Sequence, residues 1–112
     1  MQDLKTFFQV QQKDGSPTAF IADCELLAIF ALNALKECGI QVPANISIIG
    51  IDDAFPADFT SPALTTFDTQ LRELGILAAE LIVQYIQKKH TIPIHILTDP
   101  VLIERESVRS IQ

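Results

Sequence analysis

Residues 46–53 read Ile-Ser-Ile-Ile-Gly-Ile-Asp-Asp, a run of β-branched apolar residues that ends in two adjacent carboxylates. A run this apolar predicts a strand covered on both faces, and such strands belong to mostly parallel sheets flanked by helices. Open α/β sheets bind ligands at the carboxyl ends of their strands, so Asp52 and Asp53 mark a candidate binding site. The octapeptide equally allows these two residues to do no more than open a turn, because Asp is common in loops.

The rest of the chain alternates helical and strand patterns. Apolar spacing and capping residues predict helices over residues 3–13, 25–39 and 70–89, and Gly39 suits the end of the second one. Runs of β-branched and aromatic residues predict strands over residues 18–22, 46–53, 64–67, 94–97 and 101–103. This order predicts an α/β fold of three layers, with a mostly parallel sheet flanked by helices.

The composition is that of one packed globular unit. Of 112 residues, 48% are hydrophobic and 20% are charged, and no segment is biased enough to suggest disorder. The net charge is −6, and the basic residues form no cluster beyond Lys88 and Lys89, so a direct nucleic-acid surface is not expected. The N-terminus lacks a signal-peptide pattern and no apolar stretch is long enough to span a membrane, which favours a cytoplasmic protein.

The cysteines and histidines do not indicate a metal site. Cys24 and Cys38 are too few and too far apart in sequence for zinc, and two reduced, buried thiols are expected instead. His90 and His95 flank Pro93 without acidic or thiol neighbours, so both are expected at the surface. The sequence therefore predicts no bound metal and no cofactor.

Two segments carry more apolar surface than a short chain readily buries. Residues 26–35 are all apolar except Asn33, so the helix over 25–39 has no wide polar face. One side can cover the sheet, and the other requires a second helix or, in a chain with so few helices, a partner subunit. The loop after the paired aspartates carries Phe55 and Phe59, which are either folded on a core or part of the wall of a pocket or interface.

Five separated blocks of sequence lie in the order and spacing of one known family. They are residues 17–20 (Pro-Thr-Ala-Phe), 27–32 (Leu-Ala-Ile-Phe-Ala-Leu), 46–53, 62–66 (Pro-Ala-Leu-Thr-Thr) and 104–108 (Glu-Arg-Glu-Ser-Val). With these blocks the chain resembles, over nearly its whole length, the carboxyl-terminal part of the LacI/GalR transcriptional regulators. Those regulators join a helix-turn-helix and a hinge to a two-lobed effector domain that is similar to periplasmic sugar-binding proteins.

The resemblance implies that this chain is part of such an effector domain, a half domain of the type I periplasmic-binding-protein-like fold. Residues 1–66 would form the second lobe, residues 67–102 would cross into the first lobe, and residues 103–112 would return. The helix-turn-helix that contacts DNA is absent from this chain, and most of the first lobe would precede Met1.

This division has a consequence for the helix over 70–89. Its predicted inner stripe consists of Leu71, Leu74, Ala78, Leu81, Ile82 and Tyr85. If the family fold were kept unchanged, this helix would lack much of the sheet that normally covers the stripe, although burying each such side chain is worth about 1.5–3 kcal/mol. We therefore expect the helix to pack against the chain's own second-lobe sheet or against another copy.

The resemblance also implies which residues bind the effector, a sugar or sugar derivative. Asp52 holds the place of an aspartate that accepts hydrogen bonds from ligand hydroxyls, and a carboxylate offers two oxygens for this purpose. Asp53 is expected to be structural. The family's Ala-Asn-Asp block is Asp23-Cys24-Glu25 here, so either Asp23 replaces the lost amide contact or the ligand differs. Thr69 stands where the family often has glutamine.

A homodimer is expected on two grounds. The family pairs through second-lobe surfaces, and Ala28, Ile29, Leu32 and Phe59 match positions in them. The helix without a polar face points independently to a partner. In the full-length protein an effector that prefers one arrangement of the lobes would alter the spacing of the DNA-binding heads. This chain, with half a cleft, is expected to bind an effector weakly or not at all.

Two other classes remain open. A periplasmic sugar-binding protein is close in fold, and differs chiefly in having an export signal and no DNA-binding head; the Leu-Thr-Thr and Arg-Glu-Ser blocks favour the regulator. An enzyme would use Asp52 and Asp53 to hold magnesium for phosphoryl transfer. That chemistry also needs another carboxylate and a lysine at neighbouring strand ends, which are not evident, so no enzymatic activity is expected.

Overall fold

The computed structural model describes residues 2–10, 17–53, 55–89 and 92–111. Its elements are, in order, α1 (Gln2–Val10), β1 (Ala19–Ile21), α2 (Glu25–Glu37), β2 (Ser47–Ile51), a 3-10 helix η1 (Phe55–Phe59), β3 (Thr65–Asp68), α3 (Leu71–Ile86) and β4 (Val101–Ile103). The three predicted helices are confirmed, as are the predicted strands other than 94–97. Residues 11–13, at the end of the first predicted helix, lie outside the described residues.

The strands form one mixed sheet in the order β1-β2-β3-β4. β1, β2 and β3 run parallel, with Phe20 beside Ile48 and Gly50 beside Thr66. β4 pairs with β3 in the antiparallel direction. The predicted α/β class, with a mostly parallel sheet and flanking helices, is therefore confirmed.

The core lies between α2 and one face of the sheet. Ala28, Ala31 and Leu35 of α2 are at most 1% exposed, as are Ile48 of β2 and Leu64 just before β3. The three α2 residues recur at intervals of three and four positions, which places them on one side of the helix. That side packs on the sheet, so the prediction that one side of this helix covers the sheet is confirmed.

α1 extends the core on the side of α2 and β1. Phe8 is 3% exposed, and its ring lies edge-on to that of Phe20 with 5.7 Å between the centroids. Lys5 of α1 forms an ion pair with Glu37 at the end of α2. α1 therefore holds the amino-terminal part of the sheet against α2.

Gly39 ends α2 as predicted. Its φ is +74°, a conformation that costs other residues free energy because of their Cβ atom. The Gly39 N–H donates to the carbonyl oxygen of Lys36 at 3.1 Å, and the Ile40 N–H donates to that of Leu35 at 2.9 Å. This pair of bonds is the Schellman motif, which satisfies the last carbonyl groups of the helix.

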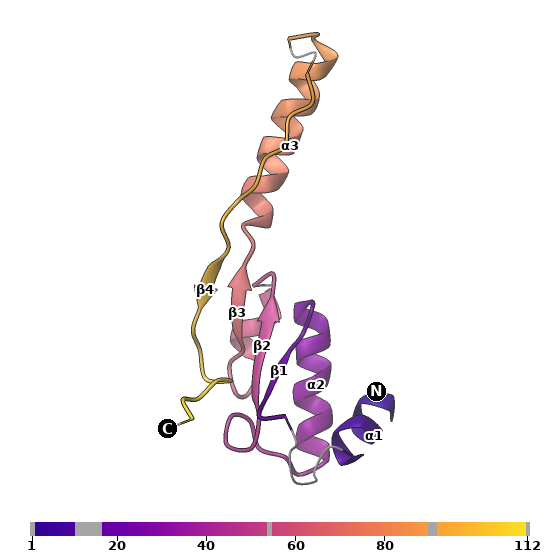
Figure 1. The fold of residues 1–112 in the computed structure, drawn as a ribbon, viewed down its shortest axis with the longest axis vertical. Coiled ribbons are helices and arrows are strands. Elements are labelled where there is room, and N and C mark those ends of the chain that lie inside the picture. The colour runs from indigo at the N-terminus through magenta and orange to yellow at the C-terminus, as the bar shows by residue number, and fades with distance from the viewer. Residues whose placement is uncertain (1, 11–16, 54, 90–91, 112) are drawn as a thin grey trace.

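α3 and the returning residues 92–100 form an arm that projects beyond the carboxyl ends of β2 and β3 (Figure 1). The radius of gyration is 18.5 Å, whereas a compact chain of this length would have about 13 Å. All residues of α3 are described, and none of them is buried. The prediction that this helix packs against the chain's own sheet is therefore wrong, because β3 leads the chain away from the sheet. Packing against another copy stays a prediction.

The predicted strand over 94–97 is also wrong. Residues 92–100 run back along α3 in an extended form without strand pairing. A strand needs a neighbouring strand for its backbone hydrogen bonds, and the described residues place none beside this segment. The sequence pattern alone could not show this, because it reports side-chain periodicity and not the presence of a neighbour.

Candidate functional site

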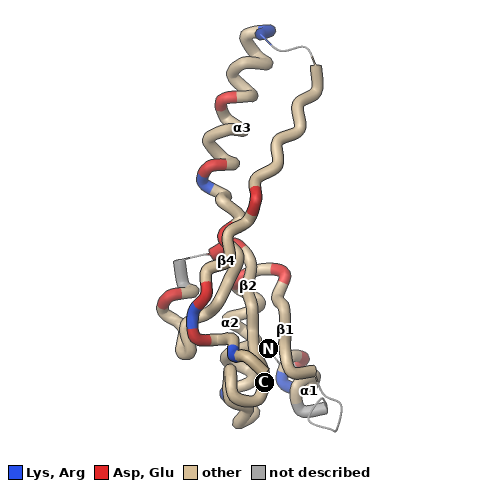
Figure 2. The backbone as a smooth tube through the Cα atoms, turned by 60° about the vertical axis from the view of Figure 1, so that its left-hand side comes forward, with Lys and Arg blue, Asp and Glu red and all other residues tan. Residues whose placement is uncertain are grey.

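The carboxyl ends of β1, β2 and β3 meet at one edge of the sheet because these strands are parallel. Asp23 and Cys24 come after β1, Asp52 directly follows β2, and Thr69 directly follows β3. All four residues predicted to bind an effector are therefore at the same edge. Acidic positions gather there, where the arm joins the sheet (Figure 2).

Asp52 and Thr69 are in direct contact. The Thr69 hydroxyl donates a hydrogen bond to Asp52 Oδ1 at 3.1 Å, although 17 positions separate the two residues. The backbone N–H of Asp52 donates to the carbonyl oxygen of Phe67 at 2.8 Å, which anchors the turn to β3. A carboxylate can accept more hydrogen bonds than this one, so Asp52 keeps capacity for a ligand hydroxyl.

The turn that carries Asp52 has an uncommon backbone conformation. φ is +99° at Asp52 and +49° at Asp53, a region that residues with a Cβ atom seldom adopt. Such conformations cost about 1–3 kcal/mol each and persist where surrounding contacts impose them. Here the Asp53 N–H approaches the Thr66 hydroxyl at 3.4 Å, and the Asp53 carboxylate is bound by Arg105. Strain of this kind is frequent at binding sites.

Arg105 is the central cation of the site. Its Nη2 donates to Asp53 Oδ1 at 2.8 Å, its Nε lies 2.7 Å from Asp58 Oδ1, and its Nη1 donates to the Leu64 carbonyl oxygen at 2.8 Å. Burial by itself lowers the pKa of Arg105, but the hydrogen bond and charge of Asp53, with the charges of Asp58 and Glu25, raise it above the ordinary value. The guanidinium therefore remains charged at every physiological pH.

Glu25 is a buried carboxylate behind the turn. It is 3% exposed, and its Oε2 accepts a hydrogen bond from the Thr66 hydroxyl at 2.8 Å. Gly50 leaves the space that this carboxylate occupies, because a Cβ atom there would lie 3.3 Å from Glu25 Oε2 and 3.1 Å from Leu64 Cδ2. The contacts run from Glu25 through Thr66 to the Asp53 N–H, so this buried group supports the turn.

Sequence reasoning did not assign a role to Glu25 or to Arg105. Arg105 lies in one of the blocks that carry the family resemblance and Glu25 lies just before another, but their partners are 52 and 41 positions away. The signal in the sequence was the local context: Glu25 is a charged residue beside an apolar segment, and Arg105 lies between two glutamates. That signal indicates a paired charge without identifying its partner.

Asp23 and Cys24 are less closely tied to the site. Asp23 is exposed, and Cys24 precedes α2 with an extended backbone and no side-chain capping bond. Within the described part of the chain, no hydrogen bond joins either residue to Asp52. Cys24 and Cys38 are free thiols as predicted, but both are partly buried rather than fully buried.

The residues predicted for the dimer interface fall into two groups. Phe59 is 75% exposed and Ile29 is partly buried at the surface of α2, near the exposed Leu26 and Phe30. Ala28 presents no surface at all, and the neighbouring Leu32 is 7% exposed, because both face the core. An interface on α2 would therefore use Ile29 directly, with the buried pair holding the helix in place.

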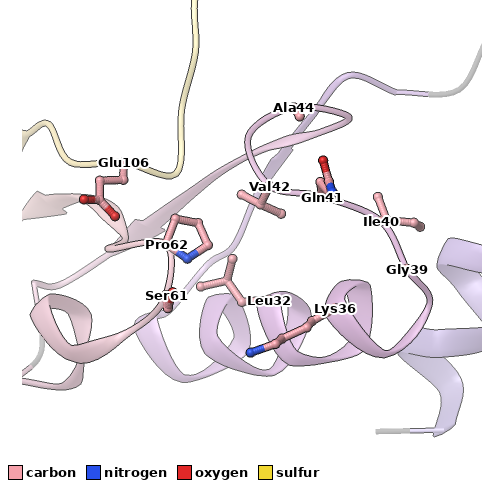
Figure 3. Close-up of a pocket in the computed structure, with 10 residues that line it drawn as sticks. All are labelled: Leu32, Lys36, Gly39, Ile40, Gln41, Val42, Ala44, Ser61, Pro62 and Glu106. Atoms are coloured by element: carbon pink, nitrogen blue, oxygen red, sulfur yellow. The ribbon is translucent and has the colours of Figure 1, made fainter.

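A separate pocket of about 570 Å³ lies at the other end of α2 (Figure 3). It is lined by Leu32 and Lys36 of α2, the loop over 39–44, Ser61, Pro62 and Glu106, and its charged lining residues are Lys36 and Glu106. None of the predicted effector residues lines it. This pocket is therefore distinct from the site at the carboxyl ends of the strands.

Metal-binding clusters and membrane-spanning helices are features of the other classes of function. Within those residues, no group of three or more His, Cys, Asp or Glu side chains could hold a metal ion. In the same part of the chain, no helix is long and apolar enough to cross a membrane. His95 is exposed, and His90 lies outside the described residues.

Comparison with known proteins agrees with this geometry. The sequence pattern of the periplasmic binding protein-like domain matches residues 1–108. The chain belongs to this family. The arabinose metabolism transcriptional repressor of Geobacillus stearothermophilus is 37% identical over 105 residues, which cover 93% of this chain and 29% of that protein.

Solved structures of LacI-type regulators have the same fold. A LacI family transcriptional regulator from Arthrobacter sp. FB24, in complex with lactose, has a TM-score of 0.82 and 27% identity, covering 96% of this chain and 40% of that one. The lac repressor dimer bound to operator and the anti-inducer ONPF also has a TM-score of 0.82, at 26% identity, covering 97% of this chain and 37% of that one. The resemblance to LacI/GalR regulators is confirmed, and the chain spans about 30–40% of the length of these proteins.

Proposed function

We propose that this chain is the effector-sensing and dimerisation region of a cytoplasmic LacI/GalR-type transcriptional regulator. The observation that carries the proposal is the hydrogen bond between Asp52 and Thr69, made at the carboxyl edge of the parallel strands in a strained turn. Two residues chosen as effector contacts from the sequence are thus neighbours in space. The relatives are transcriptional repressors. To regulate transcription in the same way, this protein would also need a DNA-binding part, which residues 1–112 do not supply.

The proposed effector is a sugar or a closely related polyol. Asp52 supplies carboxylate oxygens as acceptors for ligand hydroxyls, and such charge-assisted bonds are stronger than neutral ones. The positive charge of Arg105 is already used by Asp53 and Asp58. This edge therefore offers acceptors to an uncharged ligand rather than a cation to an anionic one. The Arthrobacter regulator was solved with lactose, which supports the same ligand class.

We also propose the division into lobes that the family resemblance implies. Residues 1–66 belong to the second lobe, residues 67–102 cross into the first lobe, and residues 103–112 return. Support comes from the arm, because α3 carries many apolar side chains and buries none of them in this chain. An apolar helix of this kind is normally covered, and a first lobe would cover it.

A chimera tests the sugar assignment. This chain would replace the matching segment of the Geobacillus repressor, and binding of arabinose, lactose and cellobiose would be measured by calorimetry. At least one sugar is expected to bind, and Asp52→Asn should weaken that binding about tenfold or more, since hydrogen bonds to charged groups are worth about 1.5–3 kcal/mol. Asp99→Asn is the matched control, because Asp99 is exposed on the arm. A folded chimera that binds none of the sugars, or an unchanged affinity in Asp52→Asn, would contradict the assignment.

Dimerisation is tested on the chain itself by sedimentation equilibrium. Ile29→Asp is expected to give monomers, because it places a charge on the apolar surface of α2. Ile82→Asp on α3, where Ile82 is 59% exposed, tests the alternative that copies pack through the arm, and Asp99→Asn, at an exposed carboxylate, is the control that should leave pairing intact. If Ile82→Asp dissociated the dimer and Ile29→Asp did not, the copies would associate through the arm, and the α2 interface would be rejected.

A further inference from the structure

Arg105 joins two parts of the chain that have different proposed roles. One carboxylate that it binds belongs to Asp53, the neighbour of the effector residue Asp52. The other belongs to Asp58, the neighbour of Phe59 on the proposed dimer surface. The separations are 2.8 Å and 2.7 Å, so one guanidinium holds both segments at hydrogen-bond distance.

The position of Arg105 is itself fixed from two further directions. Its Nη1 donates to the Leu64 carbonyl oxygen at 2.8 Å, and its backbone N–H donates to the Thr65 hydroxyl at 2.9 Å. The guanidinium is planar and its donors point in fixed directions, so it cannot follow one carboxylate without changing its geometry toward the other. A displacement of the Asp53 turn therefore reaches Asp58 through a rigid group.

The two contacts differ in exposure. The Arg105 side chain is 14% exposed and that of Asp53 is 24% exposed, whereas that of Asp58 is 66% exposed. Exposed ion pairs are weakened by water and salt. The Asp58 contact is consequently the weaker of the two. A partner subunit that covered the adjacent Phe59 would shield Asp58 from water and so strengthen this contact.

We propose that Arg105 couples effector binding at Asp52 to subunit pairing at the surface formed by Ile29 and Phe59. This inference rests on the proposed function for the identity of those two surfaces. Pairing that covers Phe59 shields the neighbouring Asp58 contact from water, and the strengthened contact holds more firmly the guanidinium that binds the Asp53 turn. By linkage, a ligand that orders the turn must favour pairing by the same factor.

The test measures amide hydrogen exchange at Asp52 and Asp53 in this chain, at concentrations where it is monomeric and where it is dimeric. Pairing is expected to slow exchange of these amides about fivefold or more, the lower range of measured couplings. Asp58→Asn keeps the size of the side chain and removes the charged contact, and it should abolish this difference. Asp58→Glu restores a carboxylate and should recover it in part. Glu73→Gln, which breaks the exposed Arg72–Glu73 pair on the arm, is the control and should behave as the unaltered chain.

Two results would overturn the proposal. One is exchange at Asp52 and Asp53 that does not change on pairing, and the other is a difference that persists in Asp58→Asn. Should Asp58→Asn fail to fold, Arg105→Lys serves instead, because an ammonium group cannot hold both carboxylates in the same planar geometry.

A second arm separates this proposal from the sugar assignment. In the chimera, the dimer dissociation constant would be measured with and without arabinose or lactose, in the unaltered form and in Asp58→Asn. A sugar that binds should tighten pairing only when Asp58 is present, and equal tightening in both forms would overturn the coupling. If neither sugar binds while the exchange result holds, the sugar assignment fails and the coupling stands.

Discussion

Replacing Thr66 by valine tests how firmly the buried carboxylate behind the turn is held. Thr66 is fully buried and Glu25 is 3% exposed, and the bond between the Thr66 hydroxyl and Glu25 Oε2 is 2.8 Å long. Valine has nearly the same shape, so the substitution removes the hydroxyl without opening a cavity. The change in stability therefore reports the contacts of this hydroxyl, namely the 2.8 Å bond to Glu25 and the longer 3.4 Å approach of the Asp53 N–H.

The magnitude follows from the charge and the burial. A hydrogen bond to a charged group contributes about 1.5–3 kcal/mol, and it is not replaced by water at a buried site. Unfolding entropy is about 2.1 cal/mol/K per residue, which for a chain of 112 residues is about 240 cal/mol/K. Thr66→Val should accordingly lower the melting temperature by about 6–13 °C.

The assay is thermal and urea unfolding followed by circular dichroism. Thr18→Val is the control, because Thr18 is exposed and should change the free energy of unfolding by less than about 0.5 kcal/mol. In a Glu25→Gln background the cost of Thr66→Val should fall to about 1 kcal/mol, the usual contribution of a neutral bond. The reasoning is refuted if Thr66→Val and Thr18→Val have equal free energies of unfolding. It is also refuted if Thr66→Val costs the same free energy in the Glu25→Gln background as in the unaltered chain.

Three further predictions concern the core, the end of α2 and the central arginine. Leu35→Ala should lose about 2–5 kcal/mol of stability in urea unfolding, since Leu35 is 1% exposed, whereas Leu97→Ala, at 82% exposure, should stay within about 0.5 kcal/mol. Gly39→Ala should lower the free energy of unfolding by about 1–2 kcal/mol through the positive φ alone, because the added Cβ meets no atom within 4 Å. Gly75→Ala, inside α3, should instead raise the helix content measured by circular dichroism. Asp53, Asp58 and Glu25 raise the pKa of Arg105 above the ordinary arginine pKa. The contribution of the charged guanidinium to the free energy of unfolding is therefore complete at any pH below the ordinary arginine pKa, and it is lost only above that pH. In Arg105→Lys the cation at this position loses its charge above about pH 10.4, the ordinary lysine pKa. The difference in unfolding free energy between the unaltered chain and Arg105→Lys should therefore widen above that pH. A difference that is constant from pH 8 to about pH 11 would contradict this prediction.

The parts of the fold that local sequence patterns determine were predicted correctly. α2 follows from its apolar spacing and from Gly39, and β2 follows from its β-branched run, because these signals lie within the element itself. The placement of Asp52 at a strand end followed from the same run. Its contact with Thr69 could be anticipated only from the resemblance, since no spacing rule joins positions 17 apart.

The errors arose where structure depends on partners that the sequence does not display. α3 has a helical pattern with an apolar stripe, but the pattern cannot say which surface covers it, and in this chain it projects from the sheet. The strand over 94–97 failed for the same reason. The roles of Glu25 and Arg105 depend on side-chain contacts across the fold, and these become visible only when Thr66 and Asp53 are brought beside them.

The arm has a mechanical consequence. α3 has 16 residues, and at a rise of about 1.5 Å per residue it reaches about 24 Å from its base. That base is β3 and β4, and β3 is the strand to which the Asp52 backbone is bonded. A rotation of about 5° at the base moves the tip of a lever this long by about 2 Å. Small adjustments around one aspartate are thus magnified at the far end of the helix, and a load applied at the tip bears directly on that aspartate.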